Sequence, residues 1–313
     1  MDHSALADRF GLGPISSCTP LTQGLMNPNW RWETPSGTFV VKRLCDVTPA
    51  AVRRQRRILE ILAAHGLPVP SPIDLTEFDH HWYAKAPLLP GTHRTGTDLA
   101  PPTCHDLGAV LAGMHTRLRE ILPEEPSSLP APADVPTALA VLSRLPTDGF
   151  GATEIAHRLR LLPEIAADRP PAVTPGPLGW THGDLTDRNL LFTGERLTGI
   201  LDWDRLAVRP YGFELIRTAA ILFDTGDGLD LPRVTAFLTG YRSRREISDA
   251  ALHAAAHRRW WDYATDTFFL RRHHDHGDHT FDHLFHRSSR LLRWWTTHRA
   301  DLDAAITAAW ARA

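Results

Sequence analysis

The chain has 313 residues, of which 42% are hydrophobic and 22% charged, and its net charge is −2 with neutral histidines. This composition is typical of a globular protein with one large domain or two lobes, each with its own core. The charge gives no basis for binding nucleic acid or an anionic membrane. We expect neither a transmembrane segment nor a secretory signal, and the three scattered cysteines indicate neither a disulfide framework nor a zinc site. We therefore expect a cytoplasmic protein.

The first 90 residues are predicted to form a small sheet with one helix. Within 14–44, the runs WRWET and TFVVKRL flank the turn sequence PSG, which indicates a hairpin. Segment 48–66 has apolar residues at helical spacing, and Gly66 and Pro68 end that helix. VPSPIDL and HWYAKAPLLPG are expected to form two further extended segments.

The rest of the chain is predicted to be mainly helical. Helices are expected over 104–122, 136–145 and 153–168 and from Tyr211 onwards, with Pro-rich connections between some of them. Two short strands interrupt them, in LLF and TGILDW. The chain is therefore predicted to be α+β, with an N-terminal lobe over 1–90, a hinge at about 86–91 and a helical C-terminal lobe over 91–313.

Two short motifs carry acceptors at fixed offsets. HGDLTDRNLLF contains Asp184 and Asn189, and ILDWD places Asp202 on the next strand. A two-stranded ribbon would bring Asn189 and Asp202 together as hard oxygen ligands for Mg²⁺, leaving Asp184 to accept a proton from an attacking hydroxyl. Asp and Asn in GDLTDRN also suit a helix cap or an Asx-turn, which is the alternative for this motif taken alone.

These motifs resemble those of the aminoglycoside phosphotransferase, choline kinase and type II homoserine kinase superfamily. HGDLTDRNLLF resembles the catalytic loop of that superfamily, and ILDWD resembles its second magnesium-binding segment. LTQGLMNPNWRW and GTFVVKR resemble its phosphate-covering loop and lysine-bearing strand, and the similarity extends in order over about 18–222. The resemblance implies a bilobal protein-kinase-like fold, ATP and Mg²⁺ as cofactors, and Asp184 as the catalytic residue.

The resemblance assigns the nucleotide's phosphates to Lys42. Lysine is rare here, since only Lys42 and Lys85 occur among 34 basic residues, and a slim point charge suits a phosphate pair better than an arginine fork. Lys85 has no such position and is expected to be solvated. The superfamily usually has a glutamate on the following helix to orient the lysine, but this chain has Gln55, and Glu60 is expected on a different face.

The remaining nucleotide contacts are expected from backbone and loop groups. Gly24 and Asn27 lie in GLMNPN, which would cover the phosphates, although a plain turn explains this segment equally well. The hinge resemblance assigns the adenine-reading carbonyl to Pro87 and the amide to Leu89, because proline has no N–H to donate.

Other side chains near these motifs have predicted supporting roles. His182 is expected to be part of the scaffold of the catalytic turn, and His115 to be a buried core histidine. Arg188 could contact the transferred phosphate or be solvated. Glu214 and Arg217 are spaced for an ion pair on one helix.

The C-terminal helices are expected to bind the acceptor. Trp260, Asp262 and Asp266 offer aromatic and acidic groups for a cationic or sugar-like ligand, although at least half of the nearby tryptophans are expected in the core. Segment 271–286 is rich in histidine, and we expect His279, His283 and His286 on one helical face beside Asp282. A solvated helix junction is the favoured interpretation of this segment, and a zinc or nickel site is the alternative.

The sequence thus predicts an ATP- and Mg²⁺-dependent O-phosphotransferase whose acceptor is a hydroxyl of a small molecule such as an amino alcohol, a sugar or an antibiotic. One alternative acceptor is a Ser or Thr of a biosynthetic peptide. An alternative of another class is a non-catalytic nucleotide-binding regulatory module, supported only by Gln55. A monomer or homodimer is expected, with no nucleic-acid or membrane partner.

Overall fold

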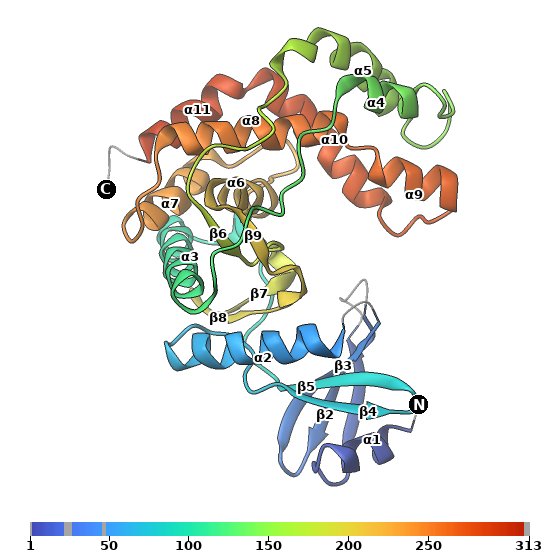
Figure 1. Ribbon diagram of the computed structural model, residues 1–313, viewed down its shortest axis with the longest axis vertical. Coiled ribbons are helices and arrows are strands. Elements are labelled where there is room, and N and C mark those ends of the chain that lie inside the picture. The colour runs from blue at the N-terminus through green and yellow to red at the C-terminus, as the bar shows by residue number, and fades with distance from the viewer. Residues whose placement is uncertain (1, 22–26, 46–47, 310–313) are drawn as a thin grey trace. The chain divides into compact units, whose positions relative to one another are not determined.

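The structure is a computed structural model that describes residues 2–21, 27–45 and 48–309, and it divides into two compact units (Figure 1). The first unit comprises Met1–Arg94, Thr116–Pro123 and His182–Leu206, and the second comprises Thr95–His115, Glu124–Thr181 and Ala207–Ala313. The catalytic motifs thus belong to the same unit as the N-terminal part. The sequence analysis placed them with the helical lobe, and its lobe boundary near residue 90 remains a prediction. No helix of the described residues is long and apolar enough to cross a membrane.

The first unit is built on a five-stranded antiparallel sheet with the strand order β1-β2-β3-β5-β4. The strands are β1 (Ser17–Leu21), β2 (Asn29–Thr34), β3 (Gly37–Leu44), β4 (Asp74–Phe78) and β5 (His81–Pro87). The predicted hairpin is confirmed as β2 and β3. The segment VPSPIDL was expected to be extended, but its strand begins only at Asp74.

Two helices belong to this sheet. The predicted helix over 48–66 is confirmed as α2 (Pro49–Ala64), which Thr48 caps by accepting a hydrogen bond from the Ala51 N–H at 3.2 Å. The short helix α1 (His3–Arg9) was not predicted, because seven residues are too few to show a clear periodicity. It buries Leu6 in a core shared with Trp32 of the sheet.

Lys85 contradicts the expectation that it is solvated. The residue is only 9% exposed, and its ammonium lies 2.6 Å from Asp74 Oδ2 on the neighbouring strand. The antiparallel register of β4 and β5 pairs Lys85 directly with Asp74, and the rings of Phe10 and Phe39 lie 5.7 and 5.0 Å from the ammonium. Cross-strand pairing thus gives Lys85 a structural role.

The catalytic segment adds a ribbon to the first unit. The predicted strands are confirmed as β7 (Leu190–Thr193) and β8 (Arg196–Ile200), which pair antiparallel and are flanked by the 3-10 turns η3 (Asp187–Asn189) and η4 (Trp203–Arg205). The Ile200 N–H donates to the Pro68 carbonyl at 2.7 Å, and Thr92 pairs with Phe192. These backbone bonds hold the ribbon to the connection between α2 and β4 and to the segment after β5.

The second unit is mainly helical. The predicted helices are confirmed, with small shifts at their ends, as α3 (Pro101–Ile121), whose last turns belong to the first unit, α4 (Val135–Leu142), α5 (Ala152–Glu164), α6 (Tyr211–Leu222), α7 (Leu231–Arg242), α8 (Asp249–Thr265), α9 (Phe268–His276), α10 (Asp282–Thr297) and α11 (Arg299–Ala308). Two short strands, β6 (Leu178–Thr181) and β9 (Ala207–Pro210), precede and follow the catalytic segment in the sequence and pair with each other. The 3-10 turns η1 (Gly96–Asp98) and η2 (Ala166–Asp168) complete the unit. The predicted α+β organisation is confirmed.

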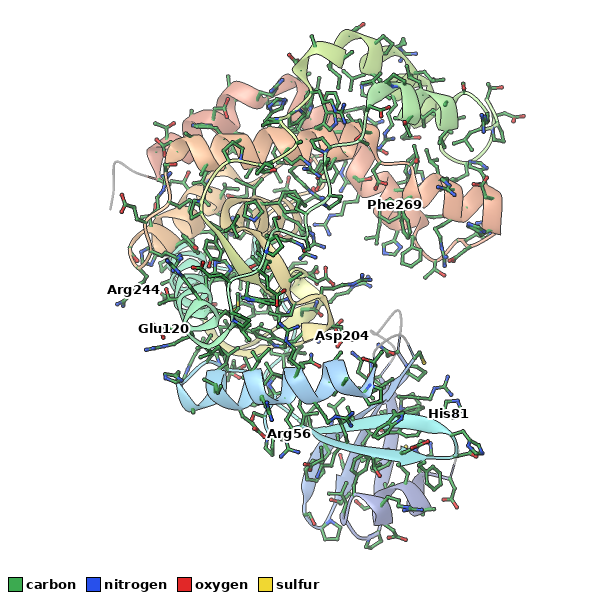
Figure 2. All side chains as sticks on the ribbon, in the orientation of Figure 1. Arg56, His81, Glu120, Asp204, Arg244 and Phe269 are labelled. Carbon is green, nitrogen blue, oxygen red and sulfur yellow. The ribbon has the colours of Figure 1, made fainter. Side chains whose placement is uncertain are left out.

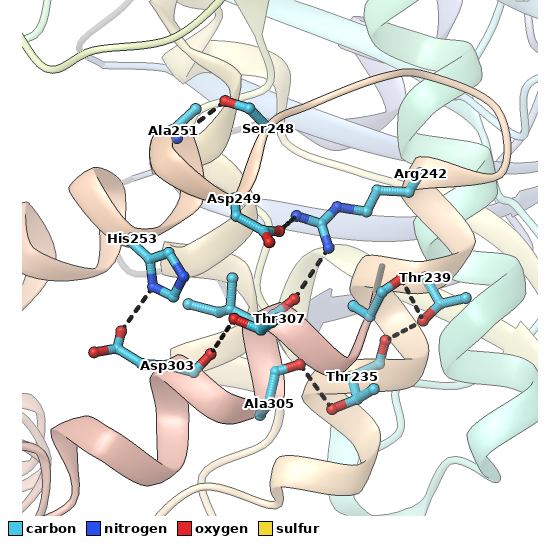
Figure 3. Close-up of polar contacts among 12 residues, drawn as sticks. Thr235, Thr239, Arg242, Ser248, Asp249, Ala251, His253, Asp303, Ala305 and Thr307 are labelled. Atoms are coloured by element: carbon cyan, nitrogen blue, oxygen red, sulfur yellow. Dashed lines mark hydrogen bonds and ion pairs between the residues drawn. The ribbon is translucent and has the colours of Figure 1, made fainter. Parts of the chain in front are cut away.

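Buried polar groups connect the helices of the second unit. Arg242 of α7 is 7% exposed, and its guanidinium donates to Asp249 of α8 and, at 3.0 Å, to the Ile306 carbonyl of α11 (Figure 3). Thr235 donates to the Ala305 carbonyl at 3.1 Å, so α7 and α11 are joined at two levels. Because a buried guanidinium is stable only when its donors are paired, Arg242 helps to define how these three helices pack.

Candidate active site

The catalytic loop is held in place by hydrogen bonds to its backbone. Asn189 Nδ2 donates to the Asp184 carbonyl at 2.7 Å, and the Asp184 N–H donates to His182 Nδ1 at 3.2 Å. His182 Nδ1 is therefore the acceptor, so the proton is on Nε2, which donates to the Leu201 carbonyl at 2.8 Å. The buried His182 ring links the loop to the end of β8, which agrees with its predicted scaffold role.

Asn189 and Asp202 lie on facing ends of the ribbon. The Leu201 N–H donates to the Asn189 carbonyl at 2.8 Å, which places Asp202 one residue from that bond. Asp202 has the left-handed backbone conformation, with φ 59° and ψ 70°, which is uncommon for a residue other than glycine. Such a conformation persists where the surroundings impose it, and Trp203 contributes by donating from Nε1 to the Ile200 carbonyl at 2.8 Å. The backbones of Asn189 and Asp202 thus lie close together at the end of the ribbon, and their role as magnesium ligands stays a prediction.

Lys42 on β3 reaches two carboxylates that follow β8. Its ammonium lies 3.2 Å from Asp202 Oδ1 and 2.5 Å from Asp204 Oδ2. Burial alone lowers the pKa of Lys42, but the charges and hydrogen bonds of Asp204 and Asp202 outweigh it and raise the pKa above its ordinary value. The Asp204 pair is the stronger of the two, because it is shorter and the Asp204 side chain is 18% exposed, against 45% for Asp202.

Asp204 is a site residue that the sequence analysis did not identify. Gln55 of α2 donates from Nε2 to Asp204 Oδ1 at 3.5 Å, so Gln55 contacts the carboxylate that pairs with Lys42. Asp204 is labelled in Figure 2. Glu60 faces elsewhere, as predicted, and accepts a 2.8 Å hydrogen bond from Arg56. The carboxylate that the superfamily usually supplies from the helix is thus supplied here from η4. The second aspartate of ILDWD, which is Asp204, was the signal in the sequence that could have identified it.

The predicted adenine-reading segment lies at the end of β5. The Leu88 N–H donates to the Thr38 carbonyl at 3.0 Å, so Leu88 directs its backbone groups towards β3. Successive residues of a strand direct their polar groups to opposite sides, so the Pro87 carbonyl is directed away from β3. The strand on that side, β4, pairs with β5 only from Lys85 back. Pro87 and Leu89 remain the predicted adenine contacts.

The phosphate-covering loop is described only in part. Gly24 lies outside the described residues. Asn27 is 7% exposed, and its Oδ1 accepts a hydrogen bond from the Cys45 N–H at 2.8 Å, just past β3. The Arg43 N–H donates to the Pro28 carbonyl at 2.9 Å. Asn27 therefore anchors the end of this loop to the strand that carries Lys42.

The predicted acceptor contacts have different surroundings in the second unit. Trp260 is 1% exposed and donates from Nε1 to Thr296 at 3.0 Å, so its ring belongs to the core. Asp262 accepts a 2.8 Å hydrogen bond from Arg258, and burial raises its pKa although Arg258 opposes the shift. Asp266 is exposed and accepts a hydrogen bond from the Phe268 N–H at 2.8 Å. Arg188, in the first unit, is also exposed.

His115 is a buried core histidine, as predicted. It is fully buried, and its ring nitrogens lie 2.6 Å from Glu214 Oε2 and 3.0 Å from the Tyr241 hydroxyl. Burial raises the pKa of Tyr241, which therefore keeps its proton for this contact. The Glu214 carboxylate is 3% exposed and contacts His115, and its pairing with Arg217 stays a prediction.

Comparison with known families identifies the chain. Residues 17–247 match the family model described as the phosphotransferase enzyme family, and this range contains the sheet, α2, the catalytic loop and the β7–β8 ribbon. The chain belongs to this family. The prediction of a phosphotransferase acting on an alcohol group of a small molecule is thus confirmed at the level of the family.

Several characterised proteins are similar to this phosphotransferase. A homoserine kinase of Acidiphilium cryptum is 26% identical over 265 residues, covering 80% of this chain and 79% of the relative. A homoserine kinase of Burkholderia mallei is 27% identical over 271 residues, covering 81% and 78%. Among solved structures, a spectinomycin phosphotransferase in complex with ADP and spectinomycin has a TM-score of 0.60 at 14% identity and covers 98% of this chain and 96% of its own. The predicted kinase-like fold is confirmed.

Proposed function

We propose that this phosphotransferase transfers the γ-phosphate of ATP to the hydroxyl of a small amino alcohol or amino acid, with Mg²⁺ as its metal. The observation that carries the proposal is the contact of Lys42 with Asp202 and Asp204, which lie 160 and 162 residues farther along the chain, beside the catalytic loop. The relatives described as homoserine kinases support an acceptor of this size and chemistry.

The donor set fits a magnesium ion. Asn189 uses its Nδ2 on the Asp184 carbonyl, so its Oδ1 is directed away from that bond. Asp202 is half exposed and supplies a carboxylate at the neighbouring position. An amide oxygen and a carboxylate, completed by phosphate oxygens and water, are the ligands Mg²⁺ prefers. Bound there, the metal would neutralise charge on the phosphate oxygens.

Side chains of the protein would bind the phosphates and activate the acceptor hydroxyl. Lys42 would bind the α- and β-phosphates, and Asp204, which Gln55 contacts, would hold the Lys42 ammonium in position for them. Asp184, whose backbone is fixed on both sides by His182 and Asn189, would orient the acceptor hydroxyl and take its proton.

The second unit is proposed to recognise the acceptor. Asp266 is exposed and suits an ammonium group, so we retain it as a candidate contact, together with Asp262. We leave out Trp260, because a side chain this buried cannot contact a ligand without opening of the core.

The experiment is a panel of hydroxyl acceptors that includes homoserine, choline, aminoglycosides and a Ser/Thr peptide, followed by release of ADP and mass spectrometry of the product. Asp184→Asn should abolish transfer to the acceptor while leaving nucleotide binding largely intact. Asn189→Ala should weaken both, because it removes a metal ligand and the bond that holds the loop. Retained turnover in Asp184→Asn would overturn the mechanism, and tight ATP binding with no transfer to any acceptor would favour the regulatory alternative.

A further inference from the structure

The histidine-rich segment forms a cluster that differs from the one expected. His279 precedes α10 instead of sharing a helical face with His283 and His286. His279 lies instead beside His273, near the end of α9, and Asp282, the first residue of α10. Their ligand atoms all lie within 4.8 Å of one another, and within the described part of the chain no other group of three His, Cys, Asp or Glu side chains does so.

Three lone-pair-bearing groups face one another in this cluster. His273 Nδ1 lies 2.9 Å from His279 Nδ1 and 3.0 Å from each oxygen of Asp282, and His279 Nδ1 lies 3.4 Å from Asp282 Oδ2. A ring nitrogen carries one proton or one lone pair, so His273 Nδ1 cannot satisfy all three neighbours by hydrogen bonding. A cation placed among the three groups would satisfy every one of them.

The distances between these ligand atoms match the distances between neighbouring ligands of a bound metal ion. With Zn–N and Zn–O bonds of about 2.0–2.1 Å, two ligands of a tetrahedral zinc lie about 3.3 Å apart. The observed 2.9–3.4 Å requires only small side-chain adjustments. Two imidazoles and one carboxylate favour zinc and its neighbours over magnesium, which takes oxygen ligands.

The surrounding structure fixes the ligands in place. The His273 ring stacks on Phe150, with centroids 3.9 Å apart and an interplanar angle of 11°. The turn that carries His279 is held by Asp278, whose carboxylate accepts from the Thr280 N–H at 3.0 Å and pairs with Arg272. These contacts hold the turn between α9 and α10 that carries His279.

We infer that His273, His279 and Asp282 form a zinc site that joins the end of α9 to the start of α10. Three protein ligands leave a fourth tetrahedral position for water. The site lies in the second unit and shares no residue with the nucleotide site, so it does not depend on the proposed kinase activity.

The test uses tag-free full-length protein that has been stripped with a chelator. It is titrated with Zn²⁺ in millimolar Mg²⁺, which occupies oxygen-rich sites, and bound zinc is counted by mass spectrometry after gel filtration. We expect one zinc per chain, and Co²⁺ in place of Zn²⁺ should show the visible absorption of a tetrahedral N,O site.

Two variants distinguish zinc binding at this site from nonspecific zinc binding by other histidines of the segment. His279→Asn should weaken zinc binding more than about 10-fold, and because its side chain is 65% exposed the fold should persist. His283→Asn is the matched control, since His283 is an exposed histidine of the same segment outside the cluster, and it should bind zinc as the wild type does. The inference is overturned if the wild-type protein binds no stoichiometric zinc, or if His279→Asn and His283→Asn lose zinc affinity equally. It is also overturned if Asp184→Asn, at the nucleotide site, loses the zinc.

Discussion

Asp204→Asn tests whether the carboxylate after β8 orients the catalytic lysine. The change keeps the shape of the side chain and removes the negative charge 2.5 Å from the Lys42 ammonium. Both side chains are less than one quarter exposed, at 22% and 18%, so solvent screens the pair only partly. A hydrogen bond between charged groups of this kind contributes about 1.5–3 kcal/mol. Asp202 remains, but it is farther from Lys42 and half exposed.

Since about 1.4 kcal/mol corresponds to a factor of ten, we expect Asp204→Asn to weaken nucleotide binding, and to lower kcat/KM, by roughly 10- to 100-fold. Titration calorimetry with Mg·ADP measures nucleotide affinity without any acceptor. The rate of ADP release, with the acceptor found in the panel, measures kcat/KM. Asp8→Asn, at an exposed position on α1 of the same unit, is the matched control and should change neither. Values for Asp204→Asn within twofold of the wild type would refute the assignment.

A double-mutant cycle with Gln55 sharpens the test. Gln55→Glu alone would place a second carboxylate about 3.5 Å from that of Asp204 and should be harmful, because like charges repel at this distance. Gln55→Glu combined with Asp204→Asn moves the carboxylate to the helix, where the superfamily usually has it, and should recover part of the lost affinity. Additive losses in the double variant would show that the two side chains do not serve the same ammonium.

Two further predictions concern the stability of the second unit. Gly108→Ala would place a Cβ 2.0 Å from a backbone carbonyl of α7 and should lower the free energy of unfolding by about 1–3 kcal/mol or more, whereas Gly113→Ala, on the same helix with nothing within 4 Å, should raise it by about 0.5–1 kcal/mol. Urea unfolding measures both, and equal effects would contradict the close packing of α3 and α7. His115→Leu should destabilise the protein by about 1–3 kcal/mol, because it removes a partner of the buried Glu214 carboxylate. Rescue by Glu214→Gln in the same background would support this cause, and a loss below 1 kcal/mol would contradict it.

Local patterns in the sequence determined most of the elements and the core of the catalytic motif. The β2–β3 hairpin and α2 follow from alternation, helical spacing and turn or cap residues, which depend only on near neighbours in the chain. Asp184, Asn189 and Asp202 were identified because their spacing is itself the signal, and the ribbon that joins Asn189 to Asp202 is short. The seven-residue helix α1 was missed because it is shorter than any periodicity that could reveal it.

Only the tertiary structure decided which distant groups meet. Asp204 became the partner of Lys42 because the turn after β8 brings it beside β3, and no local pattern relates residues 162 positions apart. Lys85 is buried because the register of two strands sets it opposite Asp74, and His273 meets His279 because the chain turns between α9 and α10. Residue types and their spacing therefore determined the chemistry available to this protein, whereas charge pairing and burial, which depend on contacts across the chain, were decided by the fold.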